Sequence, residues 1–169
     1  MDALEALMTR RSIRRFSARP VEDGLVVELL RAAMAAPSAG NQQPWHFVVI
    51  RDRQRLDAIA AGLPYAGMAR EAQLAVLVCG DAGLEKHPGF WIQDCAAATE
   101  NLLISAHARG LGAVWVGVHP REDRVAHMRS LCGVPEPIVP FSVVPIGYPA
   151  EEPEQVDRFD SGRIHNEDW

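Results

Sequence analysis

One segment, residues 90–109, constrains the fold of this chain more than any other. Its apolar residues cover most of the circumference of a helix instead of one stripe: Phe90, Trp91, Ile92, Cys95, Ala96, Ala97, Ala98, Leu102, Leu103, Ile104, Ala106 and Ala108. A helix that is apolar nearly all round must be buried nearly all round. The surface that covers it is either the rest of the chain or a second subunit, and the sequence leaves both open.

The other periodic segments indicate strands interleaved with helices. Helical spacing of apolar residues predicts further helices over 2–9, 22–36, 53–61 and 122–131. Short apolar or β-branched runs predict strands over 45–51, 74–79, 113–118 and 141–146. The run at 74–79 is apolar throughout, as expected of a central strand covered on both faces. This order of elements is typical of a layered domain that contains both helices and strands.

Length and charge narrow the class of protein. A chain of 169 residues with 48% hydrophobic content fits a single globular domain spanning 1–169. A formal net charge of −5 argues against general binding to nucleic acid or to acidic membranes. No apolar run is long enough to span a bilayer, and the N-terminus lacks the apolar core of a signal peptide. We therefore expect a cytoplasmic protein.

The cysteines and histidines predict neither a disulfide framework nor a metal site. The three cysteines are widely spaced, and none belongs to a Cys-x-x-Cys pair. The six histidines form no compact set with the spacing of metal ligands. We predict that the chain binds no metal.

A basic cluster follows the first predicted helix. Five arginines fall within ten positions, with Ser12 among them: Arg10, Arg11, Arg14, Arg15 and Arg19. Guanidinium groups present a rigid fork of donors that matches phosphate or carboxylate. The cluster therefore predicts an anion site, although a solvated basic turn would have the same sequence.

A second polar segment, residues 36–45, lies between a helix end and a strand start, where binding residues are common. Its polar side chains are amides and a hydroxyl, which match the edge of a neutral heterocycle. The alternative is a turn whose side chains cap the preceding helix. Together with the basic cluster, the segment points to a nucleotide-like cofactor. The chain has no Gly-x-Gly-x-x-Gly after the first strand and no Gly-Lys-Ser/Thr, which excludes the Rossmann and P-loop interpretations.

Two further segments fit such a cofactor. Residues 110–118 are rich in glycine and end at a strand terminus, where a backbone N–H could closely approach a ring atom. Residues 156–160 include Arg158, which could return to the phosphate.

With these motifs the chain resembles the nitroreductase family of FMN-dependent oxidoreductases. The resemblance extends from Leu4 to Trp169 and rests on five motifs: Arg10-Arg-Ser-Ile-Arg14, Pro37-Ser-Ala-Gly-Asn-Gln-Gln-Pro-Trp45, Gly110-Leu-Gly-Ala-Val-Trp115, Ile146-Gly-Tyr-Pro149 and Arg158-Phe-Asp160 with His165 and Trp169. It implies an α+β sandwich in which helices flank a mixed, mostly antiparallel sheet. It also implies a homodimer that exchanges C-terminal arms (about 148–169) and holds FMN at the subunit interface.

The resemblance assigns roles to individual residues. Arg10, Ser12 and Arg158 are implied phosphate ligands, Arg11 contributes its backbone, and Arg14 faces the pyrimidine edge of the flavin. The partner subunit's loop would supply its copies of Pro37, Ser38, Asn41 and Gln43. Val116 to Val118 would line the ring, with the Gly117 amide near flavin N5. No side chain is implied to act as acid or base, because hydride moves directly between nicotinamide and N5.

The implied activity is a ping-pong reaction in which NAD(P)H reduces FMN and an electron-poor small molecule then takes the electrons. A nitroaromatic, a quinone or an enone would serve as acceptor. The segment 62–70 is short, which predicts an open or differently covered substrate side. The alternatives are a specialised reaction, such as reductive dehalogenation or flavin remodelling, or a flavin carrier or sensor without turnover.

Overall fold

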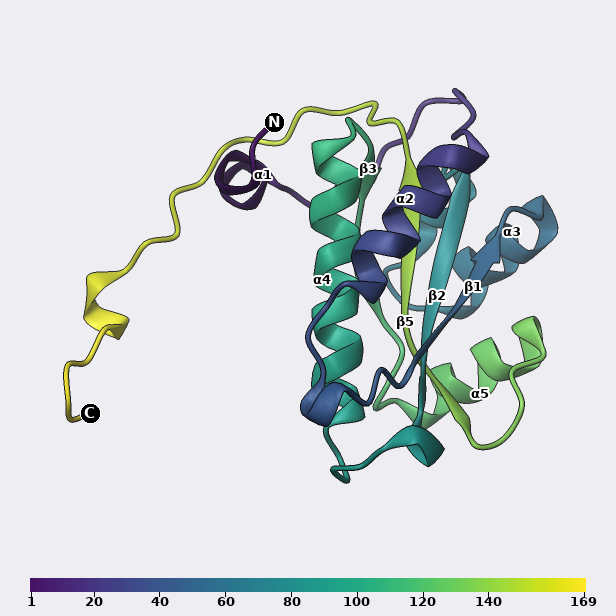
Figure 1. The fold of residues 1–169 in the computed structure, drawn as a ribbon. Helices are drawn as coiled ribbons and strands as arrows, with labels where there is room; N and C mark the ends of the chain where they lie inside the picture. Colours follow the sequence, from purple (N-terminus) through teal and green to yellow (C-terminus); the bar gives the residue numbers. More distant parts are fainter.

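Two layers of helices enclose a five-stranded sheet in the computed structural model of this protein, which describes residues 1–169 (Figure 1). The strands are β1 (Trp45–Ile50), β2 (Leu74–Asp81), β3 (Gly112–Ala113), β4 (Val116–Gly117) and β5 (Ile138–Gly147). They follow the order β1-β2-β5-β3, and β4 also pairs with β5. Every ladder is antiparallel, and the only parallel pairing is an isolated bridge between Ser12 and Ala113. The α+β class expected from the sequence is confirmed.

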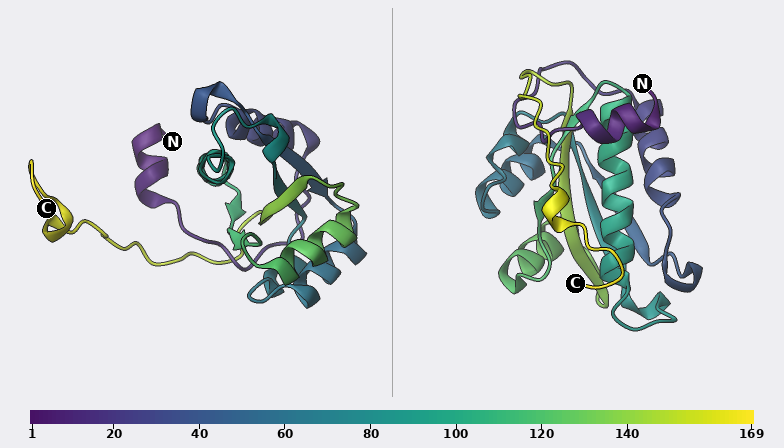
Figure 2. Two further views of the ribbon diagram at one scale, coloured as in Figure 1. Left: turned by 90° about the horizontal axis from the view of Figure 1, so that it is seen from below. Right: turned by 90° about the vertical axis from the view of Figure 1, so that its left-hand side faces the viewer.

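The helices divide between the two faces of the sheet (Figure 2). α2 (Asp23–Met34) and α4 (Trp91–Ala108) cover one face, and α3 (Arg53–Gly62) and α5 (Glu122–Cys132) cover the other. The short α1 (Ala3–Thr9) lies beside the C-terminal end of α4. Four 3-10 turns complete the chain: η1 (Ala39–Asn41), η2 (Gly67–Arg70), η3 (Ala82–Leu84) and η4 (Ser161–Arg163). None of these helices combines the length and apolar character needed to cross a membrane.

The β2 strand is central because its residues supply both cores. Leu74, Val76 and Val78 pack beneath α2 and α4. The alternate residues Ala75, Leu77 and Cys79 pack beneath α3 and α5. Since successive side chains of a strand point to opposite faces, a strand buried on both faces must be apolar at every position. The expectation of a covered central strand at 74–79 is confirmed.

The strand expected over 113–118 is instead two short strands, β3 and β4. Both pair with β5 in one continuous register, in which Ala113 faces Ile146 and Val116 faces Val143. Between these two strands Pro145 lies opposite Val114, and a proline has no N–H to donate to a ladder. The other predicted helices and strands are present, with ends that differ by up to three residues.

The long helix is buried on one side only. Cys95, Ala98, Leu102 and Ala106 lie in the core beneath α2 and the sheet. A stripe on the other side remains partly or fully exposed: Gln93, Ala97, Glu100, Ile104 and Ala108. We call this the open stripe of α4. The chain by itself therefore does not cover the helix nearly all round.

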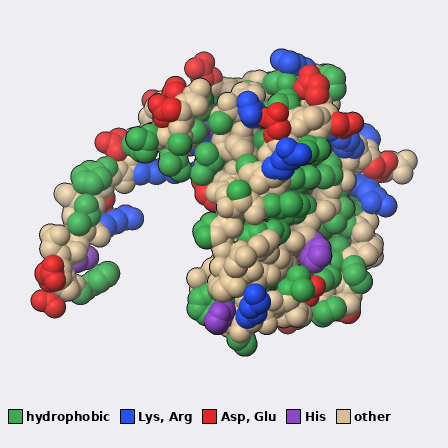
Figure 3. Space-filling model, viewed as in Figure 1, with side chains coloured by type: hydrophobic (Ala, Val, Ile, Leu, Met, Phe, Trp, Pro, Cys, Tyr) green, Lys and Arg blue, Asp and Glu red, His purple; other side chains and the backbone are tan.

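The C-terminal arm, residues 150–169, extends away from the body of the molecule (Figures 1 and 3). Its first residues are tied to the N-terminal loop, because the Ala150 N–H donates to the Arg15 carbonyl (2.9 Å). Further along, large apolar side chains face solvent, with Phe159 75% and Trp169 100% exposed. An extended segment that exposes groups of this size lacks the surface they would pack against.

A substitution at Gly112 tests how the N-terminal loop packs on the sheet. A Cβ added at Gly112 would lie 2.6 Å from the buried Ile13 side chain. We expect Gly112→Ala to lower the free energy of unfolding by about 1–3 kcal/mol, because Ile13 must move. Gly24→Ala is the control: nothing lies within 4 Å of its new Cβ, so it should be neutral or stabilising. Urea denaturation measures both, and equal effects would contradict this packing.

Candidate functional site

The N-terminal basic loop, residues 10–16, is held in place by its backbone and its apolar residues. The Ile13 N–H donates to the Ala113 carbonyl (3.0 Å), next to the Ser12–Ala113 bridge. Ile13 and Phe16 are buried beneath the loop. The loop therefore lies in a fixed position across the end of the sheet, and Arg10, Arg11 and Arg14 project from it.

Three arginines line one cavity of about 320 Å³, which we call the basic cavity. Arg10 and Arg11 come from the N-terminal loop and Arg158 from the arm, while Leu7, Met8, Val156, Asp157 and Phe159 complete the lining. The structure thus brings together two of the expected phosphate ligands, Arg10 and Arg158, although nearly the whole chain separates them. Ser12 does not line this cavity.

The three guanidinium groups differ in what they already bind. Arg10 Nε lies 3.3 Å from a Glu100 carboxylate oxygen. Arg11 donates to four carbonyls, those of Met8, Arg10, Glu154 and Val156, so its side chain ties the arm to the end of α1. The resemblance had implied that Arg11 contributes mainly its backbone. Arg158 takes part in no ion pair or hydrogen bond, which leaves its donors available.

Arg14 faces a second cavity of about 160 Å³, the ring cavity. Its lining contains the strand segment that the sequence had associated with a ring, together with two residues of segment 62–70: Arg14, Pro64, Tyr65, Val114, Trp115, Val116, Gly117 and Arg124. The Arg14 N–H bonds the Glu151 carboxylate, which connects this loop to the start of the arm. Arg14 and Gly117 therefore line the same cavity.

Gly117 leaves an open space beside the backbone. A Cβ there would meet no atom within 4 Å, and its φ lies outside the left-handed region. Neither the backbone conformation nor the packing of the chain therefore requires glycine at this position. A flat ligand could approach the Gly117 backbone closely.

The amide-rich loop, residues 37–43, has an unusual backbone. Asn41 (φ 52°) and Gln43 (φ 47°) adopt left-handed conformations, which side-chain-bearing residues seldom do. The loop is braced internally, because the Gln43 N–H donates to Ser38 Oγ (3.0 Å) and its amide donates to Asn41 Oδ1 (2.8 Å). It does not cap α2, whose Ala32 carbonyl accepts from Asn101 instead.

Two residues that the sequence analysis did not single out hold this loop. Asp94, only 4% exposed, accepts from the Ala39 N–H (3.0 Å) and from the Gln42 side-chain amide (2.7 Å). Gln42 Oε1 in turn accepts from the N–H groups of Lys86 and His87. A carboxylate in the first turn of a helix is favoured by the helix dipole. The one available signal was an acidic residue directly before the apolar run 95–98.

The basic loop and the amide loop lie at opposite ends of α4. The amide loop is bonded to Asp94, whereas Thr9 Oγ1 lies 2.8 Å from Nε2 of His107. Thirteen residues separate these positions, or about 20 Å at the rise of an α-helix. A groove of about 370 Å³ contains Pro37 and Ser38 with Phe90, Gln93, Asp94 and Ala97, and no residue of the basic loop. Within one chain, the predicted site residues therefore form separate groups.

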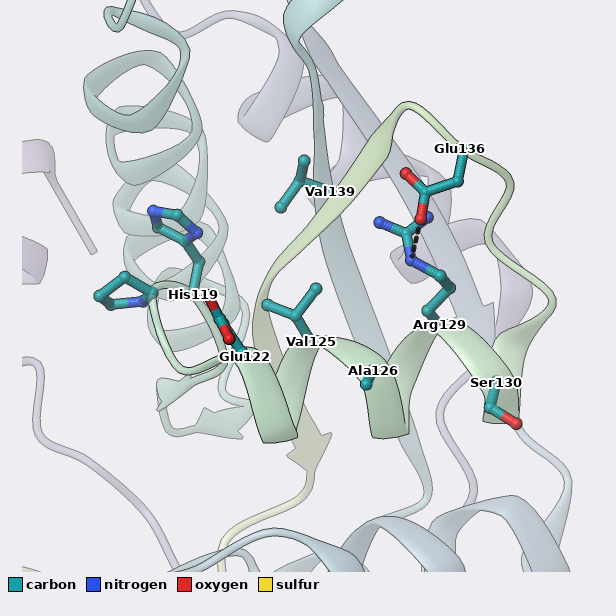
Figure 4. Close-up of a pocket in the computed structure, with 9 residues that line it drawn as sticks. His119, Glu122, Val125, Ala126, Arg129, Ser130, Glu136 and Val139 are labelled. Carbon is teal, nitrogen blue, oxygen red and sulfur yellow. Dashed lines mark ion pairs between the residues drawn. The ribbon is translucent and has the colours of Figure 1, made fainter.

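A larger cavity, about 550 Å³, lies elsewhere, between α5 and the start of β5 (Figure 4). It includes no residue predicted to bind a cofactor. Arg129 is already matched there, because it pairs with Glu136 (3.1 Å) and donates to the carbonyls of Val134 and Pro135. His119 packs edge-on against Trp91, and burial lowers its pKa. Its polar groups show no arrangement for chemistry.

Arg15 and Arg19, the other two arginines of the basic cluster, are exposed but paired. Arg15 Nε lies 3.0 Å from Glu71, and this hydrogen bond lowers the pKa of Glu71. The Arg19 guanidinium lies over the Tyr148 ring, 3.7 Å from its centroid. Neither lines the basic cavity or the ring cavity.

A family model and several known proteins match this chain over most of its length. A family model described as "Nitroreductase family" matches residues 7–148. A Methanothermobacter thermautotrophicus protein, by name a candidate NADH dehydrogenase/NAD(P)H nitroreductase, is 53% identical over 169 residues, which cover 100% of this chain and 88% of that protein. A solved Bacteroides thetaiotaomicron structure with the same candidate name has a TM-score of 0.95 and 41% identity, covering 99% of this chain and 98% of that one.

A second solved structure bears on the cofactor. It is a candidate nitroreductase from Desulfovibrio desulfuricans in complex with FMN, with a TM-score of 0.86 and 32% identity, and it covers 100% of this chain and 98% of that one. The family model spans most of the chain, and the archaeal relative is more than half identical along its whole length. The chain therefore belongs to the nitroreductase family.

Proposed function

We propose that this chain is an FMN-dependent oxidoreductase that passes electrons from NAD(P)H to an electron-poor small molecule such as a quinone, a nitroaromatic or an enone. Family membership supports a flavin oxidoreductase in general. The observation that carries the proposal in this chain is the basic cavity, where Arg10, Arg11 and Arg158 converge. Guanidinium groups from both ends of the chain converge on one cavity although the net charge is −5.

The described residues fit FMN. The unpaired Arg158 and the partly exposed Arg10 suit a phosphate, which would displace Glu100 from Arg10. The open space beside Gly117 suits a flat ring, with Arg14 at its edge. Asn41 and Gln43, which both have a left-handed backbone, are exposed, as residues that contact a heterocycle need to be.

FMN, when bound, supplies hydride and electron transfer between the nicotinamide and the acceptor. The side chains bind and orient: Arg10 and Arg158 fix the phosphate, and the Arg14 cation stabilises negative charge at the pyrimidine edge of the ring. For a quinone acceptor, NAD(P)H, one proton and the quinone yield NAD(P)⁺ and the hydroquinone. No general acid or base among the side chains is required.

The complete site requires two chains in this proposal. Two-fold packing through the open stripe of α4 would place the amide loop of one subunit beside the basic loop of the other, because the two loops lie at opposite ends of that helix. The exposed apolar residues of α1, Leu4, Leu7 and Met8, and those of the arm would be covered in the same dimer. A homodimer with exchanged arms accounts for all three exposed surfaces.

The first test separates an enzyme from a flavin carrier. We expect the purified protein to be yellow or to gain the visible absorbance of oxidised flavin with added FMN. NADH or NADPH should bleach that absorbance without oxygen, and an added quinone should restore it. A colourless protein that gains no flavin absorbance when FMN is added would contradict the proposal. Failure of both nicotinamides to bleach bound FMN would favour the carrier or sensor.

The phosphate assignment predicts the effect of a double substitution. Arg10→Ala with Arg158→Ala removes charge-assisted hydrogen bonds, so FMN affinity should fall by about 10²- to 10⁴-fold with the fold intact. Arg163→Ala is a matched control, because Arg163 pairs with Asp160 inside the arm (3.0 Å). Fluorescence titration with FMN measures the FMN affinity of the wild type, the double variant and Arg163→Ala. Stoichiometric FMN in the double variant would refute the assigned roles.

His107 offers a readout independent of activity. Burial, and then the charges of Arg10 and Arg11, lower its pKa. A phosphate bound by Arg10 and Arg158 offsets the charge of Arg10, so FMN should raise the pKa of His107 in an NMR titration. An unchanged or lowered pKa would place the phosphate elsewhere.

The Asp94 contacts predict that the amide loop depends on this carboxylate. Asp94→Asn turns an amide N–H₂ toward that of Gln42, so one hydrogen bond is lost. We expect the free energy of unfolding to fall by about 1.5–3 kcal/mol and FMN affinity to fall as well. Asp123→Asn, the same change at an exposed position in the first turn of α5, should leave FMN affinity unchanged. Equal FMN affinity in all three proteins would contradict a positioning role for Asp94.

A further inference from the structure

The ring cavity has an unusual charge for this chain. Two guanidinium groups, from Arg14 and Arg124, line it, and none of its eight lining residues is acidic. The chain as a whole has 22 acidic and 17 basic residues. Neither arginine takes part in any of the ion pairs of the structure. Unpaired guanidinium groups beside a cavity are typical of a site that binds an anion.

The position of Arg124 is fixed by one hydrogen bond. Its Nη1 donates to the Gly117 carbonyl (2.9 Å), and the residue is half-buried on α5. Nε and Nη2 have no partner within the chain, so the guanidinium retains free donors next to the backbone where the ring is proposed to lie. Arg14 is the cation assigned to the flavin edge, which leaves Arg124 for a second ligand.

Tyr65 supplies an aromatic surface at the rim of the same cavity. Its side chain is 89% exposed, and its backbone has a φ of 62°. A left-handed conformation is unfavourable for a bulky residue, and glycine or asparagine would avoid much of that cost. Only four non-glycine residues have positive φ, and two of them are Asn41 and Gln43 of the amide loop. A planar ligand could stack on the exposed phenol.

We propose that the electron acceptor of this enzyme is a planar aromatic or quinonoid compound with an acidic substituent. Its ring lies against Tyr65, and its carboxylate or sulfonate pairs with Arg124. This inference rests on the proposed function. The acidic group is not consumed: an acceptor quinone gains two electrons and one proton from NAD(P)H and a second proton from water, and leaves as the hydroquinone.

The test compares two acceptors that differ in charge, 4-nitrobenzoate and 4-nitrobenzamide, in the reoxidation of NAD(P)H-reduced holoenzyme. The measured quantity is the ratio of their second-order rate constants, and intrinsic reactivity cancels when proteins are compared. Arg124→Gln should lower the rate constant for 4-nitrobenzoate relative to that for 4-nitrobenzamide by about 10- to 100-fold. Arg124→Lys keeps the charge and should retain part of the preference.

Two further variants serve as controls. Arg121→Gln removes an exposed charge at the start of α5 that lies outside the cavity, and the ratio should match the wild type. Tyr65→Gly relieves the backbone strain, so it should fold, and it should slow both acceptors by a similar factor. As a readout without turnover, 4-hydroxybenzoate should perturb the flavin absorbance of the oxidised wild-type holoenzyme and not that of Arg124→Gln.

Three results would overturn the inference. One is an equal ratio in the wild type and Arg124→Gln. Another is an effect of Arg124→Gln confined to the reduction by NADPH, which would assign the guanidinium to a phosphate of the nicotinamide. The third is a protein that binds no FMN or resists reduction, because that result removes the proposed function itself. A protein of that kind would react with neither the neutral nor the anionic acceptor, in the wild type and in every variant. The first two results leave these reactions intact, so failure of the inference can be distinguished from failure of the proposed function.

Discussion

The α4 helix determines where both binding loops can lie. One side of it packs through Cys95, Ala98 and Leu102 into the core beneath α2 and β2, which fixes the helix against the sheet. Its first turn holds the amide loop through Asp94, and its last turn contacts the end of α1 through His107. Because a helix is rigid along its axis, the two loops remain about 20 Å apart in any one chain.

The open stripe of α4 suggests how loops at opposite ends of the helix could meet in one site. A single chain leaves it uncovered, together with the apolar residues of α1 and of the arm. One two-fold contact would cover these surfaces and combine the two loops into a site. In this proposal, burial of apolar surface and assembly of the FMN site follow from the same contact between two subunits.

Sequence patterns predicted the layers of this fold well and the polar contacts poorly. The strand at 74–79 and the long helix were evident, because extensively buried elements leave largely apolar runs in the sequence. The division of 113–118 depends on Pro145, about thirty residues further along the chain, and local spacing carries no trace of it. The same holds for Asp94, whose partner Gln42 lies 52 residues away. The two loops could be recognised in the sequence. The contacts that hold them come from residues distant in the sequence.

The arginines show how local electrostatics differ from net charge. Arg15 and Arg19 lie in the same cluster as Arg10, yet they are matched by Glu71 and by Tyr148. The Arg11 side chain donates hydrogen bonds to carbonyls of the arm. Arg14, Arg124 and Arg158 take part in no ion pair, and they line the cavities where we propose that the cofactor and the acceptor bind. The spacing of charges in the sequence could not distinguish these groups, because the partners come from distant segments.

Subunit complementation tests the central claim, a site divided between two chains, most directly. One variant carries Arg10→Ala with Arg158→Ala, and the other carries Asn41→Ala with Gln43→Ala, so each alone should bind little FMN. After mixing and re-association, each heterodimer has one intact site, and FMN occupancy should recover to about a quarter of the wild-type level. If both variants dimerise and exchange subunits but the mixture binds no more FMN than either variant alone, the divided site is contradicted.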